Sequence, residues 1–331
     1  MSASAPQTVE TKDPRTIAAD TRVWDKTALQ KFHAGQTPER KAQDGESLAR
    51  VFNLAAKVPA LKEALDWAAA HDIDIVIDRT SRGVGGYYMN GTGVVALAES
   101  SFWNDSRLAG VVVHEIRHAW QDNQGMISTA EYRLDHYIIK NALIEADATA
   151  HQHLAEQQMN VYSSAEYNSQ REAKGENTDW SKKSREEAAQ RIADPKAYLL
   201  AQFKKWYTSH LPELYGRAAT QRFARQYGMT DIKPPDWNLE MPMVTVPTDT
   251  GVDFLHRRSL RKLGEGYTGG NYFKAADLKQ VKAEQLSPAR ARAFFNHAAA
   301  NDTGLVKEVV KRERAERQKT GTRRLVNPWA P

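Results

Sequence analysis

Apolar residues recur at helical spacing through most of the chain after residue 46. Over residues 46–70, Leu48, Val51, Leu61 and their neighbours predict two amphipathic helices with a break near Pro59. The same periodicity predicts further helices at residues 131–158, 185–228 and 288–318. Residues 159–184 are polar, and we expect them to form a loop or an excursion from the core.

Residues 72–78 follow a different pattern, in which isoleucines alternate with mostly acidic residues. A period of two over this length is typical of a strand. Two more short strands are predicted at 87–89 and 94–98, joined by a glycine-containing turn at 90–93. The fold class is therefore α+β and predominantly helical, with a small antiparallel sheet.

One helix stands out, at residues 108–121. Its apolar positions form one stripe, and a neighbouring face carries Gly110, His114, His118 and Gln121. A helix of this kind is typical of the floor of a cleft, with one side packed on the core. Ser106 is the expected N-cap.

Shifts in polarity divide the chain into three parts. Residues 1–45 are polar and predict a flexible N-terminal arm with a short helix near 23–32. Residues 46–230 hold the periodic segments and form the main domain. Residues 231–331 are a C-terminal extension, partly helical and basic, in which 267–273 is rich in turn residues.

Composition limits the chemistry that is possible. The 331 residues include no cysteine, so any metal ion must be held by His, Asp or Glu. No apolar run approaches the roughly 20 residues of a membrane helix, and the N-terminus lacks the features of a cleavable signal. We expect a cytoplasmic protein, with export by a route that needs no cleavable signal left open. A net charge of +5 is mild for this length and does not require a nucleic-acid partner.

His114, Glu115 and His118 form the pattern H-E-x-x-H on the predicted helix. Positions i and i+4 lie on one helix face, so both imidazoles can bind one ion, with the glutamate beside them. A catalytic zinc ion needs a third protein ligand. Gln121 and Gln124 stand where the metzincin pattern requires Gly and His, which excludes that class. In a gluzincin-like arrangement the ligand is a Glu of the following helix, where Glu145 lies.

The segment His114-Glu-Ile-Arg-His118 followed by Glu145-Ala-Asp147 resembles the gluzincin-type zincin metallopeptidases, and in particular a bacterial metallopeptidase-like domain of unknown function. The resemblance covers roughly residues 70–155. It implies a zincin-like core in which an active-site helix precedes a ligand-bearing helix. It also implies Zn²⁺ held by His114, His118 and Glu145, with Glu115 as the general base.

One position departs from the pattern of that family. Many gluzincins carry an acidic residue four positions after the glutamate ligand, where this chain has Thr149. Asp147 lies only two positions after Glu145, which places it on another side of the helix. Asp147 is therefore either a residue that orients a ligand or the third ligand itself, and the resemblance favours Glu145. We expect His151 to be a surface residue.

The leading hypothesis is a zinc-dependent hydrolase that cleaves peptide or protein substrates with a zinc-activated water. The strand at 94–98 is expected to present its edge to the substrate. Candidates for stabilising the oxyanion are Tyr132, His136, Tyr137, Tyr207, His210 and Tyr215. The alternative is a non-catalytic metal-binding or structural module whose basic C-terminal helix, after Lys307, binds nucleic acid or an acidic partner.

Overall fold

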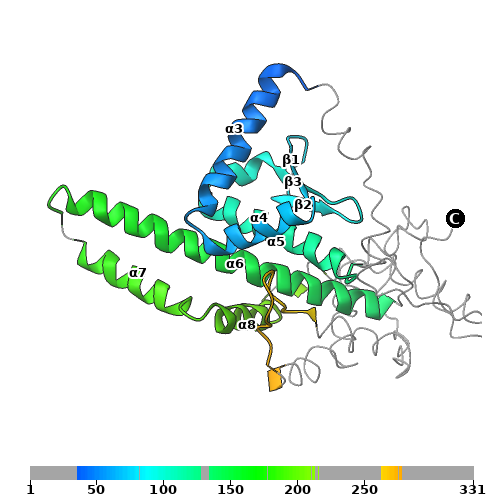
Figure 1. The fold of residues 1–331 in the computed structure, drawn as a ribbon. Coiled ribbons are helices and arrows are strands. Elements are labelled where there is room, and N and C mark those ends of the chain that lie inside the picture. Colours follow the sequence, from blue (N-terminus) through cyan, green and yellow to red (C-terminus); the bar gives the residue numbers. More distant parts are fainter. Residues whose placement is uncertain are drawn as a thin grey trace, which may run out of the picture.

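The computed structural model describes residues 36–81, 83–127, 134–176, 178–209, 211–212, 215, 262–274 and 276–277. Its helices, shown in Figure 1, are α3 (Pro38–Ala55), α4 (Pro59–Ala70), α5 (Asp105–Asn123), α6 (Leu134–Glu172), α7 (Asp179–Arg191) and α8 (Pro195–Trp206). The remaining elements are β1 (Asp74–Asp78), β2 (Gly86–Met89), β3 (Val94–Ala98) and the short 3-10 helix η1 (Glu99–Trp103). The predicted α+β, predominantly helical class is confirmed.

The three strands form a mixed sheet in the order β1-β3-β2. β1 runs parallel to β3 and β2 runs antiparallel to it, so the expectation of a wholly antiparallel sheet is wrong. The five apolar residues of β3, from Val94 to Ala98, are all buried, as expected for a strand with neighbours on both sides. β3 therefore has no free edge, and the prediction that it binds substrate is wrong. β2 is an outer strand of this sheet.

Helix α5 packs between the sheet and helix α6. The side chain of Asn104 accepts a hydrogen bond from the backbone N–H of Arg107 at 3.0 Å and caps the helix. Ser106, the predicted cap, instead donates to the backbone carbonyl of Glu156 at 3.1 Å. A Cβ atom at Gly110 would lie 2.6 Å from Cγ of Glu156, so the absence of a side chain there allows the two helices to approach closely.

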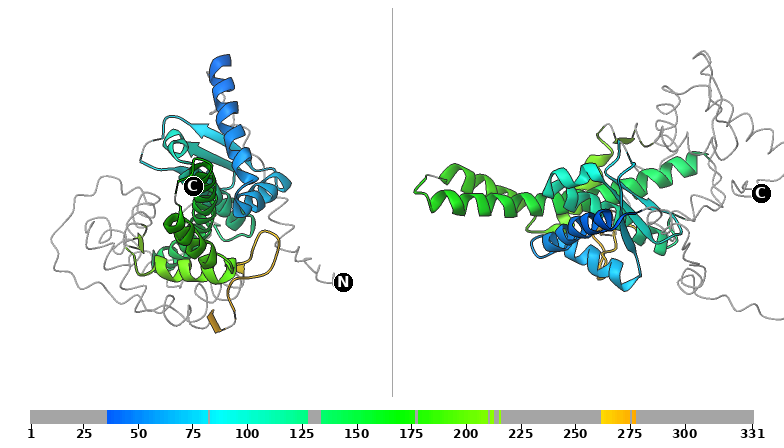
Figure 2. Two further views of the ribbon diagram at one scale, coloured as in Figure 1. Left: turned by 90° about the vertical axis from the view of Figure 1, so that its left-hand side faces the viewer. Right: turned by 90° about the horizontal axis from the view of Figure 1, so that it is seen from above.

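Helix α6 continues far beyond its predicted end at residue 158, through to Glu172. With α7 it forms a long helical hairpin that projects from the rest of the described structure (Figures 1 and 2). Residues 159–184 are therefore mostly helical and do not form a loop, but they do form the expected excursion from the core. α7 has no buried residue, so its apolar periodicity is weak and the sequence carried little helical signal there.

A segment from the C-terminal third packs into the main core. Leu263, Tyr272 and Phe273 are all buried, and the rings of Phe273 and Phe203 lie 5.0 Å apart. Within the residues described, no helix combines the length and the apolarity needed to cross a membrane. The helices expected near 23–32 and at 288–318, and the basic segment after Lys307, lie outside the described residues.

Candidate metal centre

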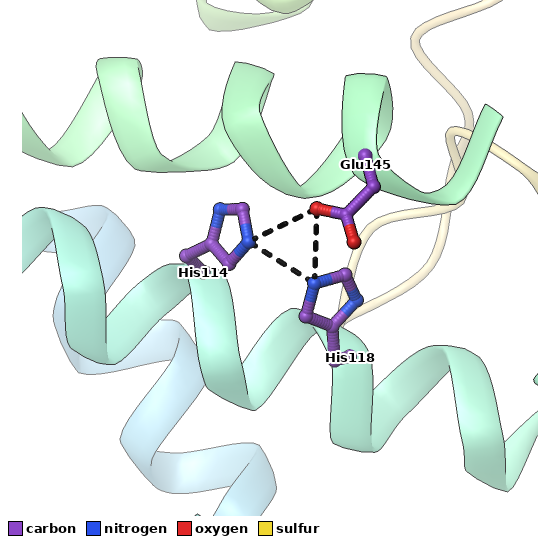
Figure 3. A group of neighbouring side chains, drawn as sticks. All are labelled: His114, His118 and Glu145. Atoms are coloured by element: carbon purple, nitrogen blue, oxygen red, sulfur yellow. Dashed lines mark hydrogen bonds and ion pairs between the residues drawn. The ribbon is translucent and has the colours of Figure 1, made fainter. Parts of the chain in front are cut away.

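His114, His118 and Glu145 point their side chains toward one another across the α5–α6 interface (Figure 3). The two Nε2 atoms lie 3.0 Å apart, and Oε2 of Glu145 lies 3.5 Å from each of them. His114 and His118 meet because they lie one turn apart on α5. The three potential ligand atoms therefore come from two segments that lie more than 20 positions apart in the sequence.

The spacing and burial of these three atoms fit a metal ion. A tetrahedral zinc ion with bonds of 2.0–2.1 Å separates its ligand atoms by about 3.3 Å. Each of the three side chains is only about a tenth exposed. Oε2 of Glu145 is buried, and among the described residues it forms no hydrogen bond of normal geometry, because the two imidazole nitrogens that face it lie 3.5 Å away. A buried carboxylate oxygen in this state requires a cation nearby.

The pKa values of Glu145 and His118 both indicate that a positive charge is favourable at this site. Burial alone would raise the pKa of Glu145, but the charges of His118 and His114 hold it well below its usual range. Burial alone would lower the pKa of His118, but Glu145 raises it to about 9. Without a metal ion, a proton on His118 thus supplies the positive charge that Glu145 requires.

Glu115 lies beside this group, between α5 and the outer strand β2. Burial raises the pKa of its carboxyl, and the charges of His114 and His118 partly offset that effect. The backbone N–H of Tyr88 in β2 donates a hydrogen bond to it and favours the charged form. A Cβ atom at Gly86 would lie 3.1 Å from Cγ of Glu115, so the β2 backbone passes close to this side chain.

Gln121 fixes the orientation of His118. Its Nε2 donates to the carbonyl of Ile144 at 3.0 Å and to Oδ2 of Asp147 at 2.8 Å. Since both partners are acceptors, the amide oxygen must be the atom that faces Nδ1 of His118, at 2.8 Å. Nδ1 therefore carries a proton, so Nε2 is the nitrogen that faces the candidate metal position and can bind an ion once it has released its own proton. The sequence placed Gln121 on the same helix face as His114 and His118 and used it to exclude another class, but it assigned no role to this residue.

Asp147 is not among the three converging ligand atoms. Its carboxylate is fully buried and accepts hydrogen bonds from Arg117 Nε at 2.7 Å, Gln121 Nε2 at 2.8 Å and the Tyr272 hydroxyl at 2.8 Å. Arg117 is also fully buried, and its guanidinium stacks 3.7 Å above the ring of Trp120. Burial would raise the pKa of Asp147, but the charge of Arg117 lowers it.

His151, expected at the surface, is in fact buried. Its Nδ1 lies 2.9 Å from the backbone carbonyl of Asp147, and burial lowers the pKa of the imidazole to about 4. Of the predicted oxyanion donors, Tyr207 is buried among aromatic rings, and the ring of Tyr215 lies 5.9 Å from that of Trp206. The side chains of the others lie outside the described residues: Tyr132, His136, Tyr137 and His210.

The fold and the donor set define an α+β protein with two histidines and one glutamate placed as in the catalytic zinc sites of several metallopeptidases. The chain belongs to DUF6782, described as the "Putative metallopeptidase family", whose sequence model matches residues 24–229, more than half of the chain. Neither a curated protein nor a solved structure matches the chain.

Proposed function

We propose that the protein is a zinc-dependent metallopeptidase in which His114, His118 and Glu145 bind Zn²⁺ and Glu115 is the general base. The observation that carries this proposal is the buried triangle of three ligand atoms beside a buried glutamate. Two imidazole nitrogens and one carboxylate oxygen leave one tetrahedral position for a water or a substrate. Because the chain has no cysteine, thiolate ligands are excluded.

Zn²⁺ and Glu115 have separate roles in the proposed hydrolysis. When bound, Zn²⁺ supplies a Lewis acid that polarises the scissile carbonyl and makes water more acidic. Glu115 takes a proton from the attacking water and returns it to the leaving amine. Its raised pKa favours the first of these steps, because a carboxylate with a higher proton affinity removes the proton more readily.

The outer strand β2 is the proposed binding element for the substrate backbone. It lies at the edge of the described sheet, and its Tyr88 already hydrogen-bonds Glu115 through the backbone N–H. An extended peptide that pairs with such an edge is held by main-chain hydrogen bonds, which depend little on its sequence. Its scissile bond would then lie next to Glu115 and the ligand triangle.

The variant Glu115→Gln tests the proposal, because it removes the base and leaves all three ligands. We expect its zinc content to equal that of the wild type, at one ion per chain by elemental analysis. Peptide cleavage, followed by mass spectrometry of a mixed peptide library, should fall by about 10²–10⁴-fold. The control is Glu156→Gln, the same change at a residue of α6 outside the triangle, which should retain full cleavage.

Two results would contradict the proposal. If the wild-type protein contains no zinc after purification without chelators, and takes up none on dialysis, the protein does not bind zinc. Full cleavage by Glu115→Gln would show that Glu115 is not the general base.

A further inference from the structure

Residues 262–274 lie outside the family match, which ends at residue 229, yet they reach the interior next to the candidate metal centre. Nζ of Lys262 contacts the backbone carbonyl and Oε1 of Gln124 at 3.3 and 3.1 Å, at the C-terminal end of α5. A cation at this position also complements the helix dipole. The segment is thus attached to the helix that carries both histidines.

The segment has a tight turn that places Tyr272 inside the protein. Glu265 and Asn271 form an isolated antiparallel bridge, and the backbone N–H of Tyr272 donates to the carbonyl of Gly264 at 3.0 Å. Gly264 has a φ of +83°, and a Cβ atom there would lie 2.5 Å from the ring of Phe273. Only glycine fits this position, so the backbone conformation that delivers Tyr272 depends on it.

A continuous chain of buried hydrogen bonds connects this segment with the metal centre. The hydroxyl of Tyr272 donates to Oδ1 of Asp147 at 2.8 Å, and Gln121 Nε2 donates to Oδ2 of the same carboxylate at 2.8 Å. Oε1 of Gln121 then accepts from Nδ1 of His118 at 2.8 Å. Each link is short, and Tyr272, Asp147 and Gln121 are all buried, so water competes little for these bonds.

We propose that Tyr272 is a positioning residue of the metal centre, which acts through Asp147 and Gln121 to hold the imidazole of His118 in its ligand orientation. This inference rests on the proposed function. Asp147 Oδ1 accepts only one other hydrogen bond among the described residues, from Arg117 Nη2 at the longer distance of 3.2 Å. Without the tyrosine hydroxyl, Oδ1 keeps only this longer bond. Arg117 Nε still holds Oδ2 at 2.7 Å, so the carboxylate stays in place but is oriented less firmly, and so is Gln121, which donates to it.

Tyr272→Phe tests the inference because it removes one hydroxyl and keeps the ring. We expect the dissociation constant for Zn²⁺, measured by competition with a chromophoric chelator, to rise about 10–100-fold. The matched control is Tyr267→Phe in the same segment. The Tyr267 hydroxyl is buried without a hydrogen-bond partner among the described residues, so its loss should change the dissociation constant less than about threefold.

A double-mutant cycle separates positioning from a general effect on packing. In a Gln121→Leu background the connection to His118 is already broken, so Tyr272→Phe should weaken zinc binding no further. An equal loss in both backgrounds would overturn the inference, and so would wild-type affinity in Tyr272→Phe. A wild-type chain that binds no zinc would instead overturn the proposed function, and this inference with it.

Discussion

Two buried carboxylates, Glu145 and Asp147, lie two residues apart on the same helix, and their surroundings differ completely. Asp147 accepts hydrogen bonds from Arg117, Gln121 and Tyr272. Glu145 faces two imidazole nitrogens at 3.5 Å, and its Oε2 forms no hydrogen bond of normal geometry in the described part of the chain. A carboxylate whose partners are complete supports structure, whereas one that lacks such bonds is suited to bind a cation.

The cations that face the two carboxylates differ in the same way. Arg117 stays charged at any ordinary pH, so the pair with Asp147 is permanent. His118 can release its proton, and its place can be taken by a metal ion. The comparison therefore assigns stability to one carboxylate and ligand binding to the other.

Neutralising each carboxylate in turn should give the largest difference. Asp147→Asn leaves the buried guanidinium of Arg117 without its anion, and we expect the free energy of unfolding to fall by about 3–5 kcal/mol. Glu145→Gln should cost the metal-free protein about 1 kcal/mol or less, because His118 then simply loses its proton. Urea unfolding of the metal-free proteins measures both values.

The two variants also serve as controls for each other, since both replace a buried acid by its amide on α6. Equal losses of stability would show that the two environments are energetically equivalent. The assignment of Asp147 to structure and Glu145 to the ligand set would then be wrong.

A smaller effect should appear in the pH dependence of stability around Asp147. Burial lowers the pKa of His151 from 6.5 to about 4, so the unfolded chain binds a proton there that the folded chain does not. Stability is therefore fully present above pH 6.5 and falls as the pH decreases toward 4, by up to about 1.4 kcal/mol per pH unit. His151→Gln should remove this slope. The free energy of unfolding, measured at several pH values for the wild type and for His151→Gln, tests this prediction. Parallel pH curves for the two proteins would contradict the burial of His151.

Much of the fold could be predicted from local pattern. The strand at 94–98 follows from a continuous apolar run, and the helix around H-E-x-x-H follows from its apolar stripe. Glu145 was located by resemblance to gluzincins. The parallel pairing of β1 with β3 was missed, because alternation along one strand does not reveal the direction of its neighbour. The first turns of α7, before residue 185, were missed because an exposed helix needs no apolar stripe.

The surroundings of the candidate metal centre were harder to predict than its candidate ligands. Gln121 shares a helix face with His118, but its bond to Asp147, and the bond of Tyr272 to the same carboxylate, join distant segments that the local sequence does not connect. His151 contacts a nearby carbonyl, but its burial depends on the packing of other segments. The pairing of Arg117 with Asp147 spans 30 positions, and an Arg on a helix is expected at the surface. The only signal for the Tyr272 segment was its richness in turn residues at 267–273.

The central claim is that Glu145, and not Asp147, completes the ligand set with His114 and His118. Anomalous diffraction at the zinc edge from crystals of the zinc-loaded protein tests it most directly. We predict one ion per chain, about 2.0–2.2 Å from both Nε2 atoms and from a carboxylate oxygen of Glu145. An ion bound to Asp147, or no ion between the two imidazoles, would contradict the account.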